Sequence, residues 1–301
     1  MRSTGVAISV RQRLLTLAQS RNWEFNRVLA RYGVERVLCR LAASPHGERF
    51  LLKGATLFTV WEGSPHRATR DLDLLGLQGR SLEELVALFR EIVAAPVQPD
   101  GLEFGDVTAE PIRASMEVGG IRILLRAELA KARITVQVDV GFGDATVPPP
   151  VRVEFPTLLD TPRPKLWAYA PETVIAEKLE AMVRLGTANT RMKDFFDVWH
   201  LAQSSAFEGD VLENAIRATF AARNTLLPTG PVTGLTAAFG DNPVKCIQWI
   251  AFVQQAGVAE TVPPLPGVVM ALEKFLGPIL RVSRVSEVRP RQRWVPKQGW
   301  L

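Results

Sequence analysis

Hydrophobic residues follow two different spacings along this chain, and the change falls near the middle. Between residues 103 and 155 they alternate with polar residues or form short β-branched runs, the pattern of strands that turn one face to a core. The strands expected there cover 103–107, 121–128, 134–140 and 151–155. From Pro171 onward the apolar positions recur every three or four residues, a spacing that predicts helices. The expected helices cover 171–185, 191–203, 209–222, 243–256 and 266–282.

Both spacings occur in the first part of the chain. Two helices are expected within the first forty-odd residues, with Ser9 as the N-cap of the first and Asn22 as the N-cap of the second. A strand over 49–52 is then expected to turn at Gly54 into a short helix over 55–61, because glycine tolerates the backbone conformation of such a turn.

A further amphipathic helix is expected over 81–93, where Ser81 and Glu84 have the spacing of a capping box. Together the elements predict an α/β (α+β) protein with a mixed sheet and flanking helices. The expected division is an α/β domain over 1–160 and a mainly helical portion over 161–301 that ends in a basic tail.

Composition narrows the class of protein. With 301 residues, 47% hydrophobic and 22% charged, the chain suits one large or two ordinary globular domains. Cys39 and Cys246 lie far apart, which predicts buried thiols in a reducing compartment and neither a disulfide framework nor a zinc site. No apolar run has the length of a membrane span, and the first residues lack the hydrophobic region of a signal peptide. The expected location is the cytoplasm, with no membrane partner.

A net charge of +5 is compatible with a polyanionic partner, and the placement of the basic residues is more informative than the total. One set recurs along the second N-terminal helix: Arg27, Arg31, Arg36 and Arg40. Another lies in the C-terminal tail beside Trp294 and Trp300: Arg281, Arg284, Arg289, Arg291, Arg293 and Lys297. Basic and aromatic residues together bind phosphates and stack on bases, but a solvated helix face and a frayed terminus have the same composition.

Two carboxylates carry the first chemical signal. Asp71 and Asp73 are two residues apart in an expected strand, so both project from one face while Leu72 and Leu74 point to the core. Carboxylates on one face repel unless a cation neutralises them, and a divalent metal ion is the usual solution. The competing interpretation is a solvated strand end, because isolated Asp-x-Asp patterns are common.

The glycine turn upstream adds to this signal. Gly54 follows Lys53 where a strand becomes a helix, so backbone N–H groups at the helix start can approach a phosphate. A phosphate site beside a metal-binding carboxylate pair predicts chemistry on a nucleoside triphosphate. Asp139 is the candidate for a third metal ligand, since a charge in its apolar strand requires a metal ion or a structural partner. Asp144 follows a glycine-rich turn and is expected to be a turn residue.

A second group of charged residues lies in the helical half. Lys178 borders the apolar stripe of the helix over 171–185, so it either extends to water or meets an anion. Asp194 and Asp197 are one helical turn apart and share a face of the next helix. Local spacing leaves two interpretations open: a functional cluster, or salt bridges that join two consecutive helices.

The motifs resemble a known family when they are taken together. A glycine turn followed by Asp71-Leu72-Asp73-Leu74 resembles the DNA polymerase β-like nucleotidyltransferase superfamily. With the helical motifs over 172–179 and 189–199, the order and spacing look like the AbiEii/AbiGii toxin family, which includes the mycobacterial MenT toxins. The resemblance covers roughly residues 25–205. It does not extend to the basic tail.

This resemblance implies a toxin of a toxin–antitoxin system with a nucleotidyltransferase-type sheet, whose helical portion completes the active site. It implies Mg²⁺ or Mn²⁺ as cofactor, nucleoside triphosphates as substrates, and transfer of nucleotides to the 3′ end of transfer RNA, which blocks translation. The implied partners are tRNA or another RNA acceptor and an AbiEi-type antitoxin. Two alternatives concern the acceptor and the chemistry: modification of a protein, or binding of triphosphate and RNA without turnover.

The family's roles fall on these positions as follows. The resemblance assigns catalysis to Asp71, Asp73, Lys178 and Asp194, and the metal to Asp71 and Asp73 with Asp139 as the third candidate. Nucleotide binding is assigned to Lys53, Gly54, Thr56, Thr69, Lys178, Arg191 and Lys193. The chain departs from the family at Ala55, where a second glycine is usual, and at Thr69, where serine is often found.

Overall fold

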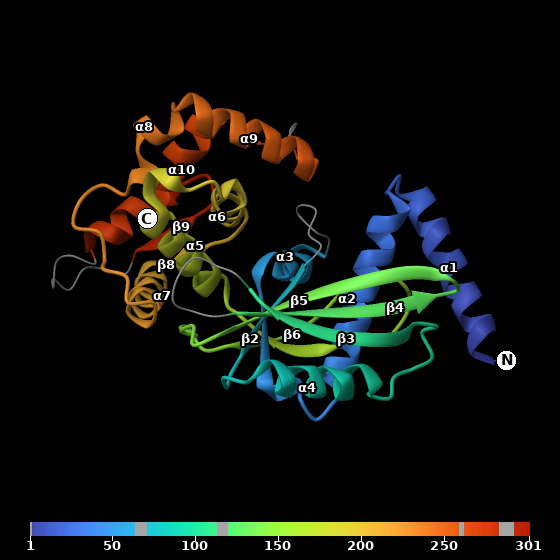
Figure 1. The fold of residues 1–301 in the computed structure, drawn as a ribbon. Coiled ribbons are helices and arrows are strands. Elements are labelled where there is room, and N and C mark those ends of the chain that lie inside the picture. The colour runs from blue at the N-terminus through green and yellow to red at the C-terminus, as the bar shows by residue number, and fades with distance from the viewer. Residues whose placement is uncertain (1, 64–70, 113–119, 259–261, 283–291) are drawn as a thin grey trace. The chain divides into compact units, whose positions relative to one another are not determined.

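The computed structural model describes residues 2–63, 71–112, 120–258, 262–282 and 292–301, and these form two compact units (Figure 1). The first unit comprises Met1–Gly143 and Val151–Ala168, and the second comprises Asp144–Pro150 and Tyr169–Leu301. The short segment 144–150 therefore belongs to the helical unit, although strands of the first unit precede and follow it.

The first unit is built on one mixed sheet. Its strands are β1 (Phe50–Lys53), β2 (Asp71–Gly76), β3 (Glu103–Pro111), β4 (Ile121–Leu129), β5 (Ala132–Phe142), β6 (Val151–Glu154) and β7 (Lys165–Ala168). Its helices are α1 (Arg2–Ser20), α2 (Phe25–Ala43), α3 (Leu57–Glu62) and α4 (Leu82–Ala94). The strand order is β3-β4-β5-β2-β1-β7-β6. Strands β2 and β5 run parallel, as do β1 and β7, while the remaining neighbours are antiparallel.

One face of this sheet packs against helices. The buried side chains of β4 and β5 alternate along each strand, and α2 and α4 contact the sheet as well as each other. Helix α2 comes very close to β5 at Gly33, where a Cβ atom would lie 2.8 Å from Ile134 and from Val136. Leu72 and Leu74 of β2 are completely buried. The alternation that the sequence predicts for these strands is therefore confirmed, and the residues between them project from the other face.

The beginnings of two helices differ from the sequence prediction. Helix α1 begins at Arg2, so Ser9 lies inside it and is not its N-cap, because Ala7 and Val10 are buried on one continuous helical face. Asn22 adopts a left-handed conformation (φ 52°) in the connection, and Glu24 caps α2 by accepting a hydrogen bond from the N–H of Asn26. The capping box of Ser81 and Glu84 on α4 is confirmed.

The second unit is mainly helical. Its helices are α5 (Pro171–Leu185), α6 (Met192–Ser204), α7 (Gly209–Ala222), α8 (Ala237–Gly240), α9 (Pro243–Ala256) and α10 (Leu265–Val282). A small antiparallel sheet joins them, with the order β10 (Gly299–Trp300), β9 (Arg293–Val295) and β8 (Phe207–Glu208). None of the helices in the described parts of either unit combines the length and apolar character that crossing a membrane requires.

The two C-terminal tryptophans pack against the helical unit. Trp294 is buried and donates its indole N–H to the carbonyl of Ala202, while Trp300 stacks on Phe275 and donates to its carbonyl. The buried Trp294 is therefore not available for base stacking, and both tryptophans lie in a small sheet rather than in a frayed terminus. The thiols of Cys39 and Cys246 are free, as expected, but half-buried rather than fully buried.

Candidate active site

The glycine turn places bare backbone against an acidic side chain. Gly54 follows β1 and opens a 3₁₀ turn, Gly54–Thr56, with φ +72°. A Cβ atom at this position would lie 2.1 Å from Oδ2 of Asp73. Both the left-handed backbone and the close approach require glycine, since any side chain would displace the carboxylate. The turn that the sequence predicts at Gly54 is confirmed, and its neighbour is one of the predicted catalytic acids.

Asp71 and Asp73 project together from β2. Both are half-buried, whereas the intervening Leu72 is completely buried on the helix-covered face. The hydroxyl of Thr56 is buried and donates a hydrogen bond to the backbone carbonyl of Asp71 (3.4 Å), so the glycine turn is tied to the first residue of β2. The prediction that both carboxylates share the face opposite the core is confirmed. Thr69, the other hydroxyl candidate, lies outside the described residues.

A row of charged residues crosses this face of the sheet. Asp73 is paired in register with Lys53 of β1 on one side and with Asp139 of β5 on the other. Asp139 is in turn paired with Arg122 of β4, and Arg122 with Glu110 of β3. Because residues in register on neighbouring strands project from the same face, five consecutive strands carry one charged side chain each in this row. Two of the three acidic candidates, Asp73 and Asp139, lie within it, and each is next to a cation.

Arg122 holds Asp139 with two hydrogen bonds. Its Nε and one terminal nitrogen lie 2.9 Å from the two carboxylate oxygens, and Gln137 adds a longer contact at 3.4 Å. The hydrogen bond to Asp139 raises the pKa of Arg122 above its ordinary value. Sequence reasoning missed Arg122. The available signal was the alternation along β4, which puts Arg122 on the face opposite Ile123.

Asp71 and Asp73 have the chemistry of ligands for Mg²⁺ or Mn²⁺. They supply hard carboxylate oxygens from one face at a spacing of two residues, and the bare backbone of Gly54 lies directly against one of the two side chains. Asp139 differs, because Arg122 binds both of its oxygens. Within the described ranges, no three His, Cys, Asp or Glu side chains gather closely enough to hold a metal ion. The oxygens of Asp71 and Asp73 fit such an ion by their chemistry and shared face. The metal role of Asp139 stays a prediction, and it competes with the pairing to Arg122.

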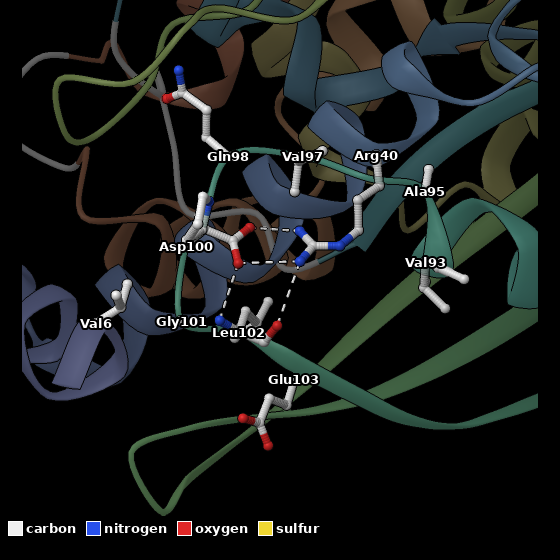
Figure 2. A pocket seen from close by; sticks show the side chains of 12 residues that line it. Val6, Arg40, Val93, Ala95, Val97, Gln98, Asp100, Gly101, Leu102 and Glu103 are labelled. Atoms are coloured by element: carbon white, nitrogen blue, oxygen red, sulfur yellow. Dashed lines mark hydrogen bonds and ion pairs between the residues drawn. The ribbon is translucent and has the colours of Figure 1, made fainter. Parts of the chain in front are cut away.

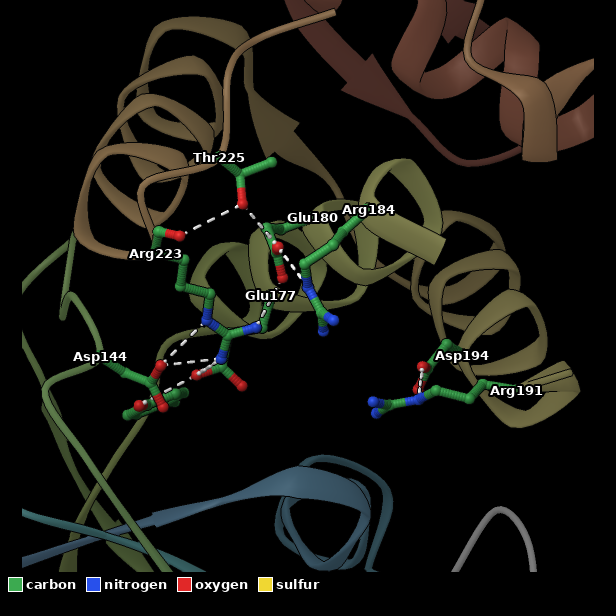
Figure 3. Close-up of polar contacts among 9 residues, drawn as sticks. Asp144, Glu177, Glu180, Arg184, Arg191, Asp194, Arg223 and Thr225 are labelled. Carbon is green, nitrogen blue, oxygen red and sulfur yellow. Dashed lines mark hydrogen bonds and ion pairs between the residues drawn. The ribbon is translucent and has the colours of Figure 1, made fainter. Parts of the chain in front are cut away.

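In the second unit, Lys178 joins helices α5 and α6. Its ammonium lies 2.7 Å from Oδ1 of Asp194 and 2.8 Å from Oδ2 of Asp197, and both aspartates are completely buried. Arg191 adds a second cation, 2.7 Å from the other oxygen of Asp194 (Figure 3). Lys193 is exposed on the same helix. The salt-bridge interpretation of this cluster is thus correct as geometry. Its catalytic and nucleotide-binding roles stay predictions.

A larger ion-pair network lies in the same unit, around the half-buried Arg223 (Figure 3). Its guanidinium contacts Asp144 at 2.8 Å, Glu180 at 3.0 Å and Glu177 at 3.1 Å. Burial opposes the charged form, but the three carboxylates outweigh it and raise the pKa of Arg223. Asp144 is therefore more than the turn residue that the sequence predicts: it connects segment 144–150 to α5 and to the residue that ends α7.

A cavity of about 300 Å³ lies elsewhere in the first unit (Figure 2). Its lining includes the buried pair of Arg40 and Asp100, whose oxygens lie 2.6 and 3.1 Å from the guanidinium nitrogens. Asp100 also accepts a hydrogen bond from the N–H of Leu102. Arg40 and Asp100 thus satisfy each other and connect α2 to the segment after α4. The lining of this cavity contains none of the predicted site residues.

Comparison with known proteins gives one family and two similar structures. The model of the nucleotidyl transferase AbiEii toxin family, type IV toxin–antitoxin system, matches residues 36–263. The crystal structure of JHP933 from Helicobacter pylori is 17% identical over 84% of this chain and 91% of its own, with a TM-score of 0.47. A Helicobacter pylori protein assigned as a nucleotidyltransferase is 17% identical over 85% of this chain and 96% of its own, also with a TM-score of 0.47. No functionally curated protein matches the sequence.

The family match extends over about three quarters of the chain and includes the glycine turn, the aspartate pair of β2 and the Lys178 cluster. These are the residues on which the sequence resemblance depended, so the predicted family is confirmed. The chain belongs to the AbiEii family of nucleotidyl transferase toxins of type IV toxin–antitoxin systems.

Proposed function

We propose that this protein is a metal-dependent nucleotidyltransferase that adds nucleotides from a triphosphate to the 3′ end of transfer RNA and thereby blocks translation. An AbiEi-type antitoxin is its expected counterpart, because the family belongs to toxin–antitoxin systems. The observation that supports the proposal is the contact between Gly54 and Asp73, which brings bare backbone beside two carboxylates on one face of β2.

Asp71 and Asp73 would hold the Mg²⁺ or Mn²⁺ ion. Such an ion, when bound, offsets negative charge on the triphosphate and favours the ionised form of an attacking hydroxyl. The backbone N–H groups of the turn that Gly54 opens would hold phosphate oxygens, and the absence of a side chain on Gly54 lets this turn lie directly against Asp73. Lys53, in register with Asp73, adds a positive charge on the same face, and Thr56 holds the carbonyl of Asp71 in place.

The proposed reaction is an in-line displacement. The oxygen of the RNA 3′ hydroxyl forms a bond to the α-phosphorus. The bond from that phosphorus to the oxygen that bridges the α- and β-phosphates breaks, and pyrophosphate leaves. The hydroxyl proton is released to solvent. In this proposal the carboxylates orient the reacting groups, and Lys178, Arg191 and Lys193 contribute positive charge to triphosphate binding, as the resemblance implies.

The test is transfer of labelled nucleotide by the purified full chain. The protein is incubated with total tRNA, Mg²⁺ and each α-³²P-labelled triphosphate in turn, beside Asp71→Ala and beside Asp106→Ala. Asp106 is a matched control, because it is a strongly exposed aspartate on β3 of the same sheet. We expect label on RNA with the wild type and Asp106→Ala, and none with Asp71→Ala or with EDTA.

Other results separate the alternatives. Label on a protein instead of RNA would favour protein modification, and binding of triphosphate and RNA without label would favour a binding module. Label on RNA with Asp71→Ala would overturn the assignment of the catalytic carboxylates.

A further inference from the structure

The positive charge of this protein is concentrated at the two ends of the chain. Residues 1–34 contain six arginines and one glutamate, which gives +5, and residues 281–301 also carry +5. The 246 residues between them contain 24 basic and 29 acidic side chains and carry −5. The two ends of the chain are therefore the first segments to consider as a surface for a polyanion.

The two basic ends differ in what their arginines contact. In the C-terminal segment the described arginines are paired, Arg281 with Glu273 at 3.0 Å and Arg293 with Glu208 at 3.3 Å. In the N-terminal segment no ion pair joins Arg11, Arg13, Arg21 or Arg31 to any carboxylate among the described residues. The N-terminal helices thus present positive charge that the protein does not neutralise by ion pairing.

The structure also divides the arginine set that the sequence singles out on α2. Arg36 is buried against Glu35, and Arg40 is buried against Asp100, so neither is available to a partner. Arg27 lies 3.8 Å from Glu24, and both side chains are more than half exposed. Arg31 has a different neighbour: its guanidinium lies 5.8 Å from the ring of Trp23.

Trp23 lies between two of the arginines that have no carboxylate partner among the described residues, Arg21 and Arg31. Its indole is 40% exposed in the connection between α1 and α2. Arg21 lies 5.9 Å from its ring, so two guanidinium groups flank one exposed aromatic side chain. Arg11 and Phe25 form a similar pair nearby in the same hairpin, at 5.6 Å. We call Arg21, Trp23 and Arg31 the Trp23 patch.

We propose that the Trp23 patch is a docking surface for RNA, with the arginines on phosphates and Trp23 stacked on an unpaired base. Naming RNA as the ligand rests on the proposed function. The chemistry of the patch supports this choice, because arginine binds phosphate with a bidentate fork and an exposed indole stacks on any base. The exposed residues of the same hairpin include Gln12, Gln19, Ser20, Asn22 and Asn26, and its exposed Glu24 is paired with Arg27. These amides and hydroxyls suit a polar nucleic acid better than a lipid surface.

The patch lies before the residues that the family model matches, which begin at position 36. It precedes the glycine turn and the predicted catalytic residues in the sequence and includes none of them. Its proposed role is to bind and hold the acceptor rather than to react with it. Loss of the patch should therefore weaken RNA binding without preventing the transfer of a nucleotide at saturating RNA.

The test measures binding of the full chain to total tRNA at several salt concentrations, without triphosphate or divalent metal. We expect Arg21→Gln/Arg31→Gln to bind at least about tenfold more weakly, with a salt slope lower by about two, one for each lost phosphate contact. Trp23→Ala should weaken tRNA binding about 5- to 100-fold at unchanged salt slope. Trp23→Phe should keep most of the wild-type affinity, because the ring can still stack on a base. Arg90→Gln/Arg133→Gln removes two exposed arginines of the same unit and should bind like the wild type.

Two comparisons keep this proposal distinguishable from the proposed function. If the wild type labels RNA while Arg21→Gln/Arg31→Gln binds tRNA normally, the docking surface is overturned and the nucleotidyltransferase stands. If the patch variants lose tRNA binding but no triphosphate gives label, the docking surface stands and the transfer activity is overturned. Binding to phosphatidylglycerol vesicles that depends on Arg21 and Arg31, with no binding of tRNA, would overturn RNA in favour of a membrane surface.

Discussion

A Cβ atom on Gly54 would lie 2.1 Å from Oδ2 of Asp73, so the turn after β1 and the acid on β2 share one crowded space. We expect Gly54→Ala to abolish nucleotide transfer, because the methyl group displaces the carboxylate of Asp73. The left-handed backbone (φ +72°) adds a cost of about 1 kcal/mol to the folded state.

Ala55→Gly is the matched control, since it changes the next residue of the same 3₁₀ turn in the opposite sense. It should keep transfer within a few fold of the wild type and lower stability by about 1 kcal/mol. The measurements are labelled transfer and thermal unfolding of both variants. Full activity of Gly54→Ala would show that the close approach to Asp73 has no catalytic role.

Arg122 and Asp139 provide a test of which acids hold the metal. Because Arg122 binds both oxygens of Asp139, we expect Asp139→Asn to keep transfer within about tenfold, while Asp73→Asn loses at least about a hundredfold. The pair is partly exposed, so a double-mutant cycle with Arg122→Gln should give a coupling free energy of about 1 kcal/mol. Equal losses for Asp139→Asn and Asp73→Asn, with Mg²⁺ dependence shifted alike, would instead make Asp139 the third metal ligand.

Lys178 can be tested for a structural and a catalytic role separately. Replacing it by methionine leaves Asp194 and Asp197 buried with one fewer cation, which should lower the free energy of unfolding by about 3–5 kcal/mol. Adding Asp197→Asn removes one of the two charges and should restore most of that stability. Lys193→Met replaces an exposed lysine on α6 and should change stability by less than about 0.5 kcal/mol.

Denaturant unfolding and labelled transfer, measured on the same samples, distinguish the two roles. If Lys178 contacts the triphosphate, Lys178→Met/Asp197→Asn is stable but transfers no nucleotide. Recovery of transfer together with stability would restrict Lys178 to joining α5 and α6.

Cys39 gives a prediction about pH. Burial raises the pKa of its thiol to about 11, so about one molecule in a thousand carries the thiolate at pH 8. In a Cys246→Ser background, the rate of iodoacetamide labelling should rise about tenfold per pH unit and level off near pH 11. Because the folded pKa lies above the ordinary value, stability from the neutral thiol is present below the ordinary pKa and is lost as the pH approaches 11. A labelling rate that saturates by pH 9 would contradict the burial of this thiol.

Short-range patterns in the sequence predict most of the elements and the faces of the central strands. The helices over 171–185, 209–222 and 243–256 have the predicted bounds, because proline or glycine marks their first turn and the apolar spacing runs through each helix. The two-residue period of β2 likewise places Asp71 and Asp73 opposite the buried leucines. Local backbone chemistry is sufficient for these features.

Pairing between distant residues was decided by the tertiary structure. Strand β7 is only four residues long and follows no clear alternation, and its position beside β1 depends on the assembled sheet. Asp144 meets Arg223 across 79 residues of sequence. Arg31 and Arg36 lie on one helix, but their surroundings differ. Arg36 is buried in an ion pair with Glu35, whereas Arg31 lies beside the exposed Trp23.

The sequence by itself determined the glycine turn and the two carboxylates on one face, because these depend on residues close together in the chain. It also determined the family, through the order and spacing of short motifs. The tertiary structure decided that Arg122 takes up Asp139, that Lys178 bridges two buried aspartates, and that the N-terminal arginines divide into buried and available ones. The physical reason is that a charged side chain's role depends on which opposite charge and how much solvent surround it, and both are set by strand register and helix packing.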